Sequence, residues 1–330
     1  MDQEQKQHQT TRCAASPSLA LVKYWGKQAG GVNLPATTSI AVTLSHLETI
    51  TEVRLVDSYE KHCVRVAGCL QDSERYSPFF DNLRATLDHD AWFEVDSINS
   101  FPTGAGLASS SSAFAALAFG CTRALGRSVP SAQLSRIARV GSGSAARAVY
   151  GGFTRLSAGA QQAEQIAPQQ HWSDLRVVIA VVDSGPKSIS SRSAMSRSAE
   201  TSIYYRNWID SSEDLAQRAE RAILHRDIEA LGSAMRQSYL RMFCTMFTAE
   251  PPIVYWLPET VAVIRACERL RHNGIPAWET MDAGPQVKVI TTARWSGRVA
   301  EALSRETGNG EILVVGAGAG PRLIETGAVT

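Results

Sequence analysis

The segment with the clearest chemical potential in this chain is residues 101–113, Phe-Pro-Thr-Gly-Ala-Gly-Leu-Ala-Ser-Ser-Ser-Ser-Ala. A glycine-containing turn leads directly into a predicted helix whose first turn holds four consecutive serines. The unpaired amides of a helix start, its dipole and several hydroxyls favour an anion such as a polyphosphate. The segment has neither the GxxxxGK(S/T) pattern of a Walker loop nor Rossmann glycine spacing. By itself it fits a phosphate site and a tightly packed helix equally well.

A second glycine-rich stretch carries Ser142, Ser144 and Arg147. Two hydroxyls and a guanidinium on one turn could bind a carboxylate or a phosphate, because arginine offers a fork of donors. Taken singly, a flexible turn with an incidental surface arginine explains this stretch at least as well.

Two lysines, Lys23 and Lys27, bracket the aromatic pair Tyr24-Trp25 at the end of an apolar stretch. On a strand the two lysines would point to the same side. A lysine flanked by large apolar groups could be partly desolvated and could bind an anionic substrate. The alternative is an edge-strand lysine that prevents aggregation.

Two further stretches follow in the second half of the chain. Hydroxyls and cations mix at residues 187–192, which end in Arg192. Asp282 lies in a turn, Asp-Ala-Gly-Pro, between two strand-like segments. Its carboxylate could serve as a catalytic base, although aspartates in turns more often bond to the local backbone.

The elements that must position these residues alternate between strands and helices, which favours an α+β fold over a doubly wound parallel sheet. We expect a buried central helix at 104–125, a helix at 131–140 capped by Ser131, and a loop or short helix at 155–172. Capping residues at 210–213 predict one long helix that reaches about residue 245. The remaining strands are expected at 19–24, 40–56, 63–66, 92–95, 177–182, 277–281, 286–291 and 312–315, and the remaining helices at 78–87, 258–274 and 299–305.

Composition narrows the class of protein. The 330 residues include 33 Lys and Arg against 32 Asp and Glu, so the net charge is +1 and no overall field favours nucleic acid or a membrane surface. The polar N-terminus lacks the apolar core of a signal peptide, and no apolar run approaches the ~20 residues of a membrane helix. We therefore expect a cytoplasmic protein. The six cysteines lack CxxC spacing and are expected to be free, and the scattered histidines support no zinc site.

Read together and in order, these segments resemble the mevalonate diphosphate decarboxylases of the GHMP kinase superfamily. Residues 20–27 resemble "AVIKYWGK", 34–44 "LP.NSS.SVTL", 101–112 "FPTAAGLASSAS", 141–152 "GSGSACRSIYGG" and 282–285 "DAGPN". The resemblance implies a ribosomal-S5-like N-terminal half and a ferredoxin-like C-terminal half. We place the boundary between an ATP-binding domain, 1–185, and a C-terminal domain, 186–330.

The resemblance also implies ATP, Mg²⁺, a phosphorylated mevalonate and a homodimer, with no metal site built from protein ligands. On this mapping Asp282 faces the C3 hydroxyl, and Lys23 and Arg147 lie near the substrate carboxylate. The residues implied for the substrate phosphates are Tyr24, Lys27, Ser142, Ser144 and Arg192. The residues implied for the ATP phosphates are Pro102, Gly104, Ala105, Gly106, Leu107, Ala108, Ser109, Ser110 and Ser112.

The implied activity is ATP-dependent decarboxylation of mevalonate 5-diphosphate to isopentenyl diphosphate through C3 phosphorylation. Alternatives are the same reaction on mevalonate 5-phosphate, giving isopentenyl phosphate, and an inactive GHMP-fold binding protein. Lys23 with Asp282 argues against a kinase that only phosphorylates C3, and Arg192 favours the diphosphate. The departures from the family pattern are Thr37 for Asn, Ala146 for Cys, Gln286 for Asn, Phe243 for His, and Ser238 near an expected Asn.

Overall fold

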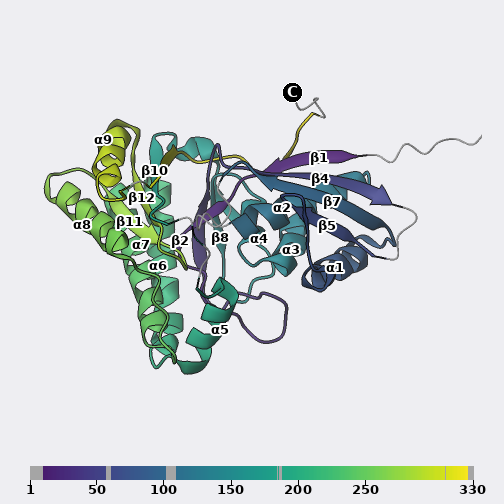
Figure 1. The fold of residues 1–330 in the computed structure, drawn as a ribbon, viewed down its shortest axis with the longest axis horizontal. Helices are drawn as coiled ribbons and strands as arrows, with labels where there is room; N and C mark the ends of the chain where they lie inside the picture. Colours follow the sequence, from purple (N-terminus) through teal and green to yellow (C-terminus); the bar gives the residue numbers. More distant parts are fainter. Residues whose placement is uncertain are drawn as a thin grey trace, which may run out of the picture.

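The computed structural model describes residues 10–56, 61–101, 109–183, 185, 188–308 and 310–325. Its described strands form three sheets, and the helices are divided between two halves that lie side by side along the long axis (Figure 1). All but one of the pairings between described strands are antiparallel, the exception being β5 (Cys63–Val66) with β7 (Trp92–Asn99). Sheets of this kind with packed helices confirm the expected α+β class.

The largest sheet belongs to the first half and has the order β14-β1-β4-β7-β5-β6. Its other strands are β1 (Thr11–Ala15), β4 (Thr49–Val56), β6 (Cys69–Leu70) and β14 (Arg322–Leu323). The central helix α2 (Ser109–Ala124) packs on β1 and β4, and α1 (Ser77–Leu87), α3 (Ser131–Gly141) and the short α4 (Ala145–Ala148) complete this layer. Most residues of α2 are buried, which confirms the expected central helix.

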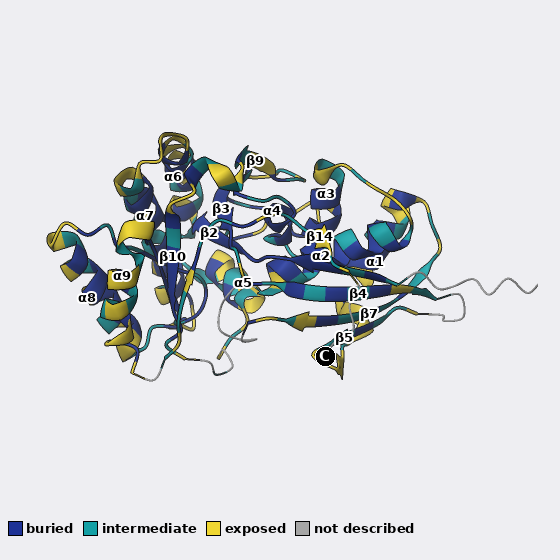
Figure 2. Ribbon diagram, turned by 90° about the horizontal axis from the view of Figure 1, so that it is seen from above, coloured by how far each residue is buried: buried dark blue, intermediate teal, exposed yellow. Residues whose placement is uncertain are grey.

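The second sheet lies where the two halves meet. It contains β2 (Ser18–Val22), β3 (Ser39–Thr43), β8 (Phe153–Leu156) and β9 (Glu164–Ala167), in that order. Figure 2 shows β2 and β3 dark blue, because both strands are buried along their whole length. Leu19 and Val42 of this sheet share a core with Val177 and Leu215 of the second half. The end of β2, where Lys23 follows, is therefore held between the halves.

The sheet of the second half has the order β11-β12-β10-β13. Its strands are β10 (Leu175–Ala180), β11 (Trp278–Met281), β12 (Val287–Thr292) and β13 (Ile312–Val315). The helices of this half are α5 (Ser191–Thr201), α6 (Tyr205–His225), α7 (Ile228–Phe247), α8 (Pro258–His272) and α9 (Ala293–Ser304). Of these, α7, α8 and α9 pack on the sheet, whereas α6 packs on α7 and on β2 and β3, and α5 packs on α7. None of the described helices is both long and apolar enough to cross a membrane.

Direct side-chain contacts also join the halves. Arg155 of β8 forms ion pairs with Glu213 at 2.6 Å and Glu220 at 2.7 Å, both on α6. Trp208 of α6 donates its Nε1–H to the carbonyl oxygen of Trp25 at 2.8 Å, and the Trp25 ring belongs to the core of the second half. The segment that follows β2 is thus fixed by packing and by a buried hydrogen bond.

Three sequence expectations are wrong. Residues 155–172 hold the strand β9 as well as a 3-10 turn, because β9 pairs with β8. Residues 210–213 lie inside α6 and cap nothing; the chain breaks at Arg226, with φ of +56°, and Asp227 caps α7 instead. Ser131 is the first residue of α3, whose N-cap is Pro130, and it makes no capping bond.

Other expectations are confirmed. The strands predicted at 63–66 and 312–315 have those bounds, and the helix that begins at Pro258 ends before Gly274, where φ is +72°. All six cysteines are free thiols. The division of the chain after residue 185 stays a prediction; β10, which precedes it, pairs with β12 and β13, which follow it.

Candidate active site

A cavity of about 550 Å³ lies at the junction of the two halves. Its described lining comes from the end of β2, the start of α2, the turn before α4, the start of α5 and the turn between β11 and β12. The predicted site residues that line it are Lys23, Tyr24, Lys27, Ser110, Ser142, Ser144, Arg147, Arg192 and Asp282. The fold therefore brings segments more than 250 residues apart to one place, and Lys23 and Asp282 are 259 positions apart.

The other predicted residues are not part of this lining. Pro102, Gly104, Ala105, Gly106, Leu107 and Ala108 lie outside the described residues. Ser109 begins α2 without lining the cavity, and its carbonyl oxygen accepts a bond from Ser112 at 3.2 Å. Ser112 is fully buried, with its hydroxyl 2.6 Å from that of Thr49. Among the described serines of α2, Ser110 alone lines the cavity.

The centre of the site is an ionised aspartate between two lysines. Lys23 Nζ lies 2.8 Å from Asp282 Oδ1, and Lys288 Nζ lies 3.3 Å from Asp282 Oδ2. Both lysines are almost fully buried, whereas 26% of the Asp282 side chain is exposed. Burial raises the pKa of Asp282, but Lys23 and Lys288 outweigh it and hold the pKa well below its usual range. Asp282 therefore presents a permanent negative charge to the cavity.

Lys23 is held in place by its backbone as well as by its charge. Its Nζ also donates to the carbonyl oxygen of Ala20 at 2.7 Å, and its amide donates to Ser238 Oγ at 2.9 Å. Burial lowers the pKa of Lys23 to about 8, and Asp282 opposes that shift. At neutral pH the lysine carries its proton, but the desolvated ammonium has little competition from water for an anionic ligand.

Arg147 adds a third buried cation. Its side chain is 1% exposed and donates to the hydroxyl of Ser39 on β3. Burial lowers the pKa of Arg147 to about 10, and Tyr24 and Asp282 oppose that shift, so the guanidinium is charged at neutral pH. Burial also raises the pKa of Tyr24 to about 12, which leaves this phenol neutral. The wall beside Asp282 thus offers cations, the donors that a carboxylate or phosphate needs, and a neutral phenol.

The remaining polar residues form a line of hydroxyls with two cations. Ser142 Oγ lies 3.3 Å from Ser110 Oγ and 3.1 Å from Ser144 Oγ, so the turn before α4 reaches the first turn of α2. Burial lowers the pKa of Lys27, and the nearby charge of Arg192 lowers it further. Both cations line the cavity, where Asp282 is the only carboxylate among the described lining residues, so this part of the wall favours a ligand with several negative charges, such as a diphosphate.

A glycine in this region is required by close packing. At Gly143, a Cβ atom would lie 2.4 Å from the hydroxyl oxygen of Tyr24. The hydroxyl of Tyr24 in turn donates to the carbonyl oxygen of Asn33 at 3.2 Å. The glycine therefore lets the Ser142–Ser144 turn approach the Tyr24 ring and keeps the phenol facing the cavity.

The departures from the family pattern have local explanations. Thr37 is buried and its hydroxyl donates to the carbonyl oxygen of Lys23 at 3.3 Å. Ser238 accepts from the amide of the same lysine, so both positions support Lys23. Gln286 accepts from the Val182 amide at 2.6 Å and anchors the turn that holds Asp282 to the end of β10. Phe243 packs against Phe247 and Trp256 and has an apolar role.

Sequence reasoning missed several residues of the site. Lys288 lies within the strand predicted at 286–291, where the lysine of Val-Lys-Val-Ile is an unusual feature of a buried strand and the one signal of its role. Ser18, Asn33 and Arg75 also line the cavity. Their sequence contexts carry no motif, and only the folded chain brings them beside the predicted residues.

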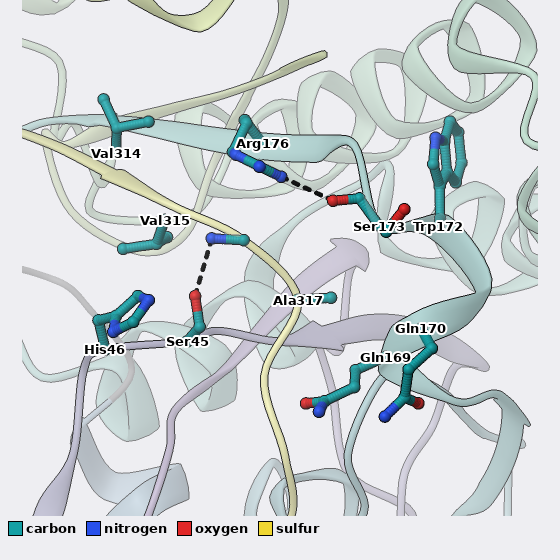
Figure 3. A pocket seen from close by; sticks show the side chains of 11 residues that line it. Ser45, His46, Gln169, Gln170, Trp172, Ser173, Arg176, Val314, Val315 and Ala317 are labelled. Carbon is teal, nitrogen blue, oxygen red and sulfur yellow. Dashed lines mark hydrogen bonds between the residues drawn. The ribbon is translucent and has the colours of Figure 1, made fainter. Parts of the chain in front are cut away.

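A second cavity, of about 380 Å³, lies elsewhere in the molecule (Figure 3). It is formed by the Ser45–His46 turn, the 3-10 turn Gln169–Trp172, the start of β10 and residues 314–317. In Figure 3, Arg176 bonds to Ser173, and Ser45 bonds to the chain at Gly316, so these polar groups already have partners. None of its described lining residues belongs to the predicted site, and we assign it no function.

The main cavity fits a nucleotide and a second phosphorylated ligand better than a metal held by the protein alone. Among its described lining residues Asp282 is the only carboxylate, and two lysines already neutralise it. No group of three or more metal-ligating side chains occurs in the described part of the chain. A magnesium ion would therefore be held mainly by phosphate oxygens, as this ion commonly is. The hydroxyls of Ser110, Ser142 and Ser144 are among the described groups of this lining that could donate to such phosphates.

Comparison with known proteins is consistent with this geometry. The family model for the diphosphomevalonate decarboxylase-like N-terminal domain matches residues 15–167, and that for the mevalonate 5-diphosphate decarboxylase C-terminal domain matches residues 177–314. The human diphosphomevalonate decarboxylase is 33% identical over 309 residues, which are 84% of this chain and 76% of that protein.

Solved structures extend the similarity to the whole fold. The mevalonate diphosphate decarboxylase from Staphylococcus aureus has a TM-score of 0.90 and 33% identity, and the match covers 96% of this chain and 98% of that one. A structure of MDDEF in complex with MVAPP, AMPPCP and magnesium has a TM-score of 0.88 and 35% identity, with 96% and 99% covered.

Proposed function

This chain belongs to the diphosphomevalonate decarboxylase family, and on that premise we propose that it uses ATP and Mg²⁺ to decarboxylate mevalonate 5-diphosphate to isopentenyl diphosphate. It has the GHMP kinase fold. The observation that carries the proposal is the ion pair of Lys23 with Asp282, beside Arg147, in a cavity rimmed by hydroxyls and cations. The bound MVAPP, AMPPCP and magnesium of MDDEF support the same ligands here.

The reaction needs a poor leaving group to become a good one. ATP supplies the phosphoryl group that converts the C3 hydroxyl into a phosphate, and Mg²⁺ neutralises the phosphate charge. The C3–oxygen bond and the C1–C2 bond then break, so that phosphate and CO₂ leave and the electrons of the C1–C2 bond form the C2–C3 double bond. The protein has to align the γ-phosphate of ATP, the C1 carboxylate and the C5 diphosphate. It also has to stabilise a positive charge that develops at C3.

Asp282 would serve both tasks. Its exposed face would accept a hydrogen bond from the C3 hydroxyl and orient the oxygen toward the γ-phosphate. Its negative charge would also stabilise positive charge at C3 after the phosphate begins to leave. Because Lys23 and Lys288 keep the carboxylate strongly acidic, orientation and electrostatic stabilisation account for more of its role than lasting proton abstraction.

The cations have separate roles. Lys23 and Arg147 would hold the C1 carboxylate so that the C1–C2 bond lies antiperiplanar to the breaking C3–oxygen bond across C2–C3. Lys27, Arg192 and the Ser142–Ser144 turn would bind the C5 diphosphate farther along the cavity. Ser110 and the predicted glycine-rich segment before it would contact the ATP phosphates. No step requires a nucleophilic side chain or a redox cofactor.

The proposal is tested by comparing two substrates with one enzyme preparation. CO₂ and ADP release with Mg-ATP is measured for mevalonate 5-diphosphate and for mevalonate 5-phosphate, and kcat/KM is compared. A higher value for the diphosphate supports the proposal, because Lys27 and Arg192 would face that end of the substrate. A preference for the monophosphate would overturn the substrate assignment, and no turnover with either would overturn the activity. The homodimer and the cytoplasmic location stay predictions from the sequence.

A further inference from the structure

Lys288 is an unusual residue for its position in the fold. It lies in β12, an interior strand of the second-half sheet, opposite Thr280 of β11 and Ile179 of β10. Its side chain is 2% exposed. Burial of an ammonium group costs free energy unless the charge is paired. A lysine at this position therefore needs a function that an apolar residue would not provide.

Lys288 forms an ion pair with the proposed catalytic carboxylate. Lys288 Nζ lies 3.3 Å from Asp282 Oδ2, while Oδ1 of the same carboxylate is occupied by Lys23 at 2.8 Å. Each oxygen thus has its own cation, and the two cations come from different halves of the protein. Lys23 follows β2, whereas Lys288 and Asp282 belong to one sheet and the turn that connects its strands.

In this arrangement the two lysines differ in whether they can contact the substrate. Lys23 is also placed beside Arg147 and faces the cavity, so its ammonium can exchange part of its contact with Asp282 for a substrate carboxylate. Lys288 does not line the cavity and is fixed by its own strand. Its contact with Oδ2 therefore persists when Lys23 turns toward the substrate.

We propose that Lys288 is a positioning residue: it fixes Oδ2 of Asp282 so that the carboxylate stays ionised and aligned with the C3 hydroxyl while Lys23 contacts the substrate. This inference rests on the proposed function and adds a residue to its machinery. The charged groups that face Asp282 are Lys23 from the end of β2, Lys288 from β12 and Arg147 from α4. Of these, Lys288 is the one beyond the reach of the substrate.

The experiment compares Lys288→Met with Lys288→Arg in the full-length enzyme. Lys288→Met removes the cation beside Oδ2 and leaves Asp282 held through Oδ1 alone, so kcat should fall, by up to about 100-fold, while KM for ATP and for mevalonate 5-diphosphate stays close to wild type. Lys288→Arg keeps a cation beside Oδ2 and should recover most of kcat. A purely structural role would lower the amount of folded enzyme without this separation of kcat from KM.

A matched control is available in the same sheet. Glu279 of β11 is fully buried and pairs with Arg236 at 2.6 Å and Arg271 at 2.5 Å, away from the cavity. Glu279→Gln breaks a buried charge network as Lys288→Met does, so it should lower the melting temperature without lowering kcat per folded active site. Active sites are counted by titration with a nonhydrolysable ATP analogue.

Each outcome decides the inference. If kcat of Lys288→Met equals that of the wild type, or if kcat falls equally in Glu279→Gln, the positioning role is overturned. The proposed function still stands in both cases, provided that the wild-type enzyme turns over. A wild-type enzyme without turnover would overturn both. If Lys288→Met does not fold, Lys288→Gln replaces it, and Lys288→Arg is compared with the wild type. A Lys288→Arg enzyme that folds normally but retains none of the activity would also overturn an assignment based on charge alone.

Discussion

Lys23 and Asp282 form a 2.8 Å ion pair across the two halves of the protein, although 259 positions separate them in the chain. The lysine is 1% exposed and the carboxylate 26%, so the pair has a buried side and a side open to the cavity. A second lysine, Lys288, completes the arrangement from the carboxylate's own half. The chemistry assigned to this site depends on that asymmetry, because only the exposed side can meet a substrate.

Loss of the Asp282 carboxylate should abolish most of the turnover. We expect Asp282→Ala and Asp282→Asn to lower kcat roughly 10²–10⁴-fold, the range for a group that acts in the transition state. ATP binding should persist, since the predicted phosphate contacts come from the other half. The measurements are CO₂ release and calorimetric titration with an ATP analogue. Activity within tenfold of wild type would reduce Asp282 to a turn residue.

The pH profile should report Lys23. A lysine loses its proton as pH rises through its pKa, and burial lowers the pKa of Lys23 from the ordinary 10.5 to about 8. If the ammonium is needed, kcat/KM should be highest below that pH and fall above it. The limb in kcat should lie at higher pH, because a bound substrate carboxylate favours the charged lysine.

The matched variant for this profile is Lys23→Arg. Arginine keeps its proton over the whole accessible range, so the basic limb near pH 8 should disappear from whatever activity remains. A basic limb at the same pH in Lys23→Arg would assign the titration to another group. An unchanged rate up to pH 10 in the wild type would contradict the need for the Lys23 ammonium.

Much of the fold follows from patterns in the sequence that act locally. The apolar run of β10, the proline that begins α8 and the glycine that follows its end all have consequences within a few residues. The secondary-structure predictions are wrong where contacts with residues distant in the sequence determine the local structure. Residues 164–167, Glu-Gln-Ile-Ala, have no extended strand-like run of their own and form β9 by pairing with β8. Arg226 separates α6 from α7 in a left-handed conformation, which its residue type does not predict.

The site divides in the same way. Motifs with several polar residues, such as Ser142 to Arg147, were recognisable, and the family resemblance indicated that they meet Asp282. Lys288 was not recognised, because one lysine in an apolar strand leaves the strand pattern intact. Its role depends on a partner six positions away across a turn whose geometry Gln286 fixes by bonding to the end of β10. The contact of Gln286 with the end of β10 joins residues far apart in the chain, and the local sequence does not reveal it.

Arg192 should contribute to binding rather than to turnover. It lies in the first turn of α5, beside Lys27 and on the cavity wall. Removal of a charged hydrogen bond to a phosphate in Arg192→Ala should raise KM for mevalonate 5-diphosphate roughly 10- to 100-fold, with kcat little changed. The control is Arg197→Ala on the same helix, whose side chain bonds to the carbonyl oxygen of Pro251 and does not line the cavity. An unchanged KM in Arg192→Ala would remove it from the substrate site.

The hydrogen bond between Trp208 and the Trp25 carbonyl should stabilise the junction of the two halves. Trp208→Phe keeps an aromatic ring but leaves a buried carbonyl oxygen without its donor at 2.8 Å, which costs about 1–3 kcal/mol. Urea unfolding followed by circular dichroism measures that loss. Trp256→Phe is the control, because the Nε1–H of Trp256 has no hydrogen-bond partner among the described residues. If the two variants lose equal stability, the loss comes from the smaller ring and not from the bond to Trp25. If Trp208→Phe loses more stability and also raises KM for the phosphorylated substrate, the bond supports the Lys23 segment.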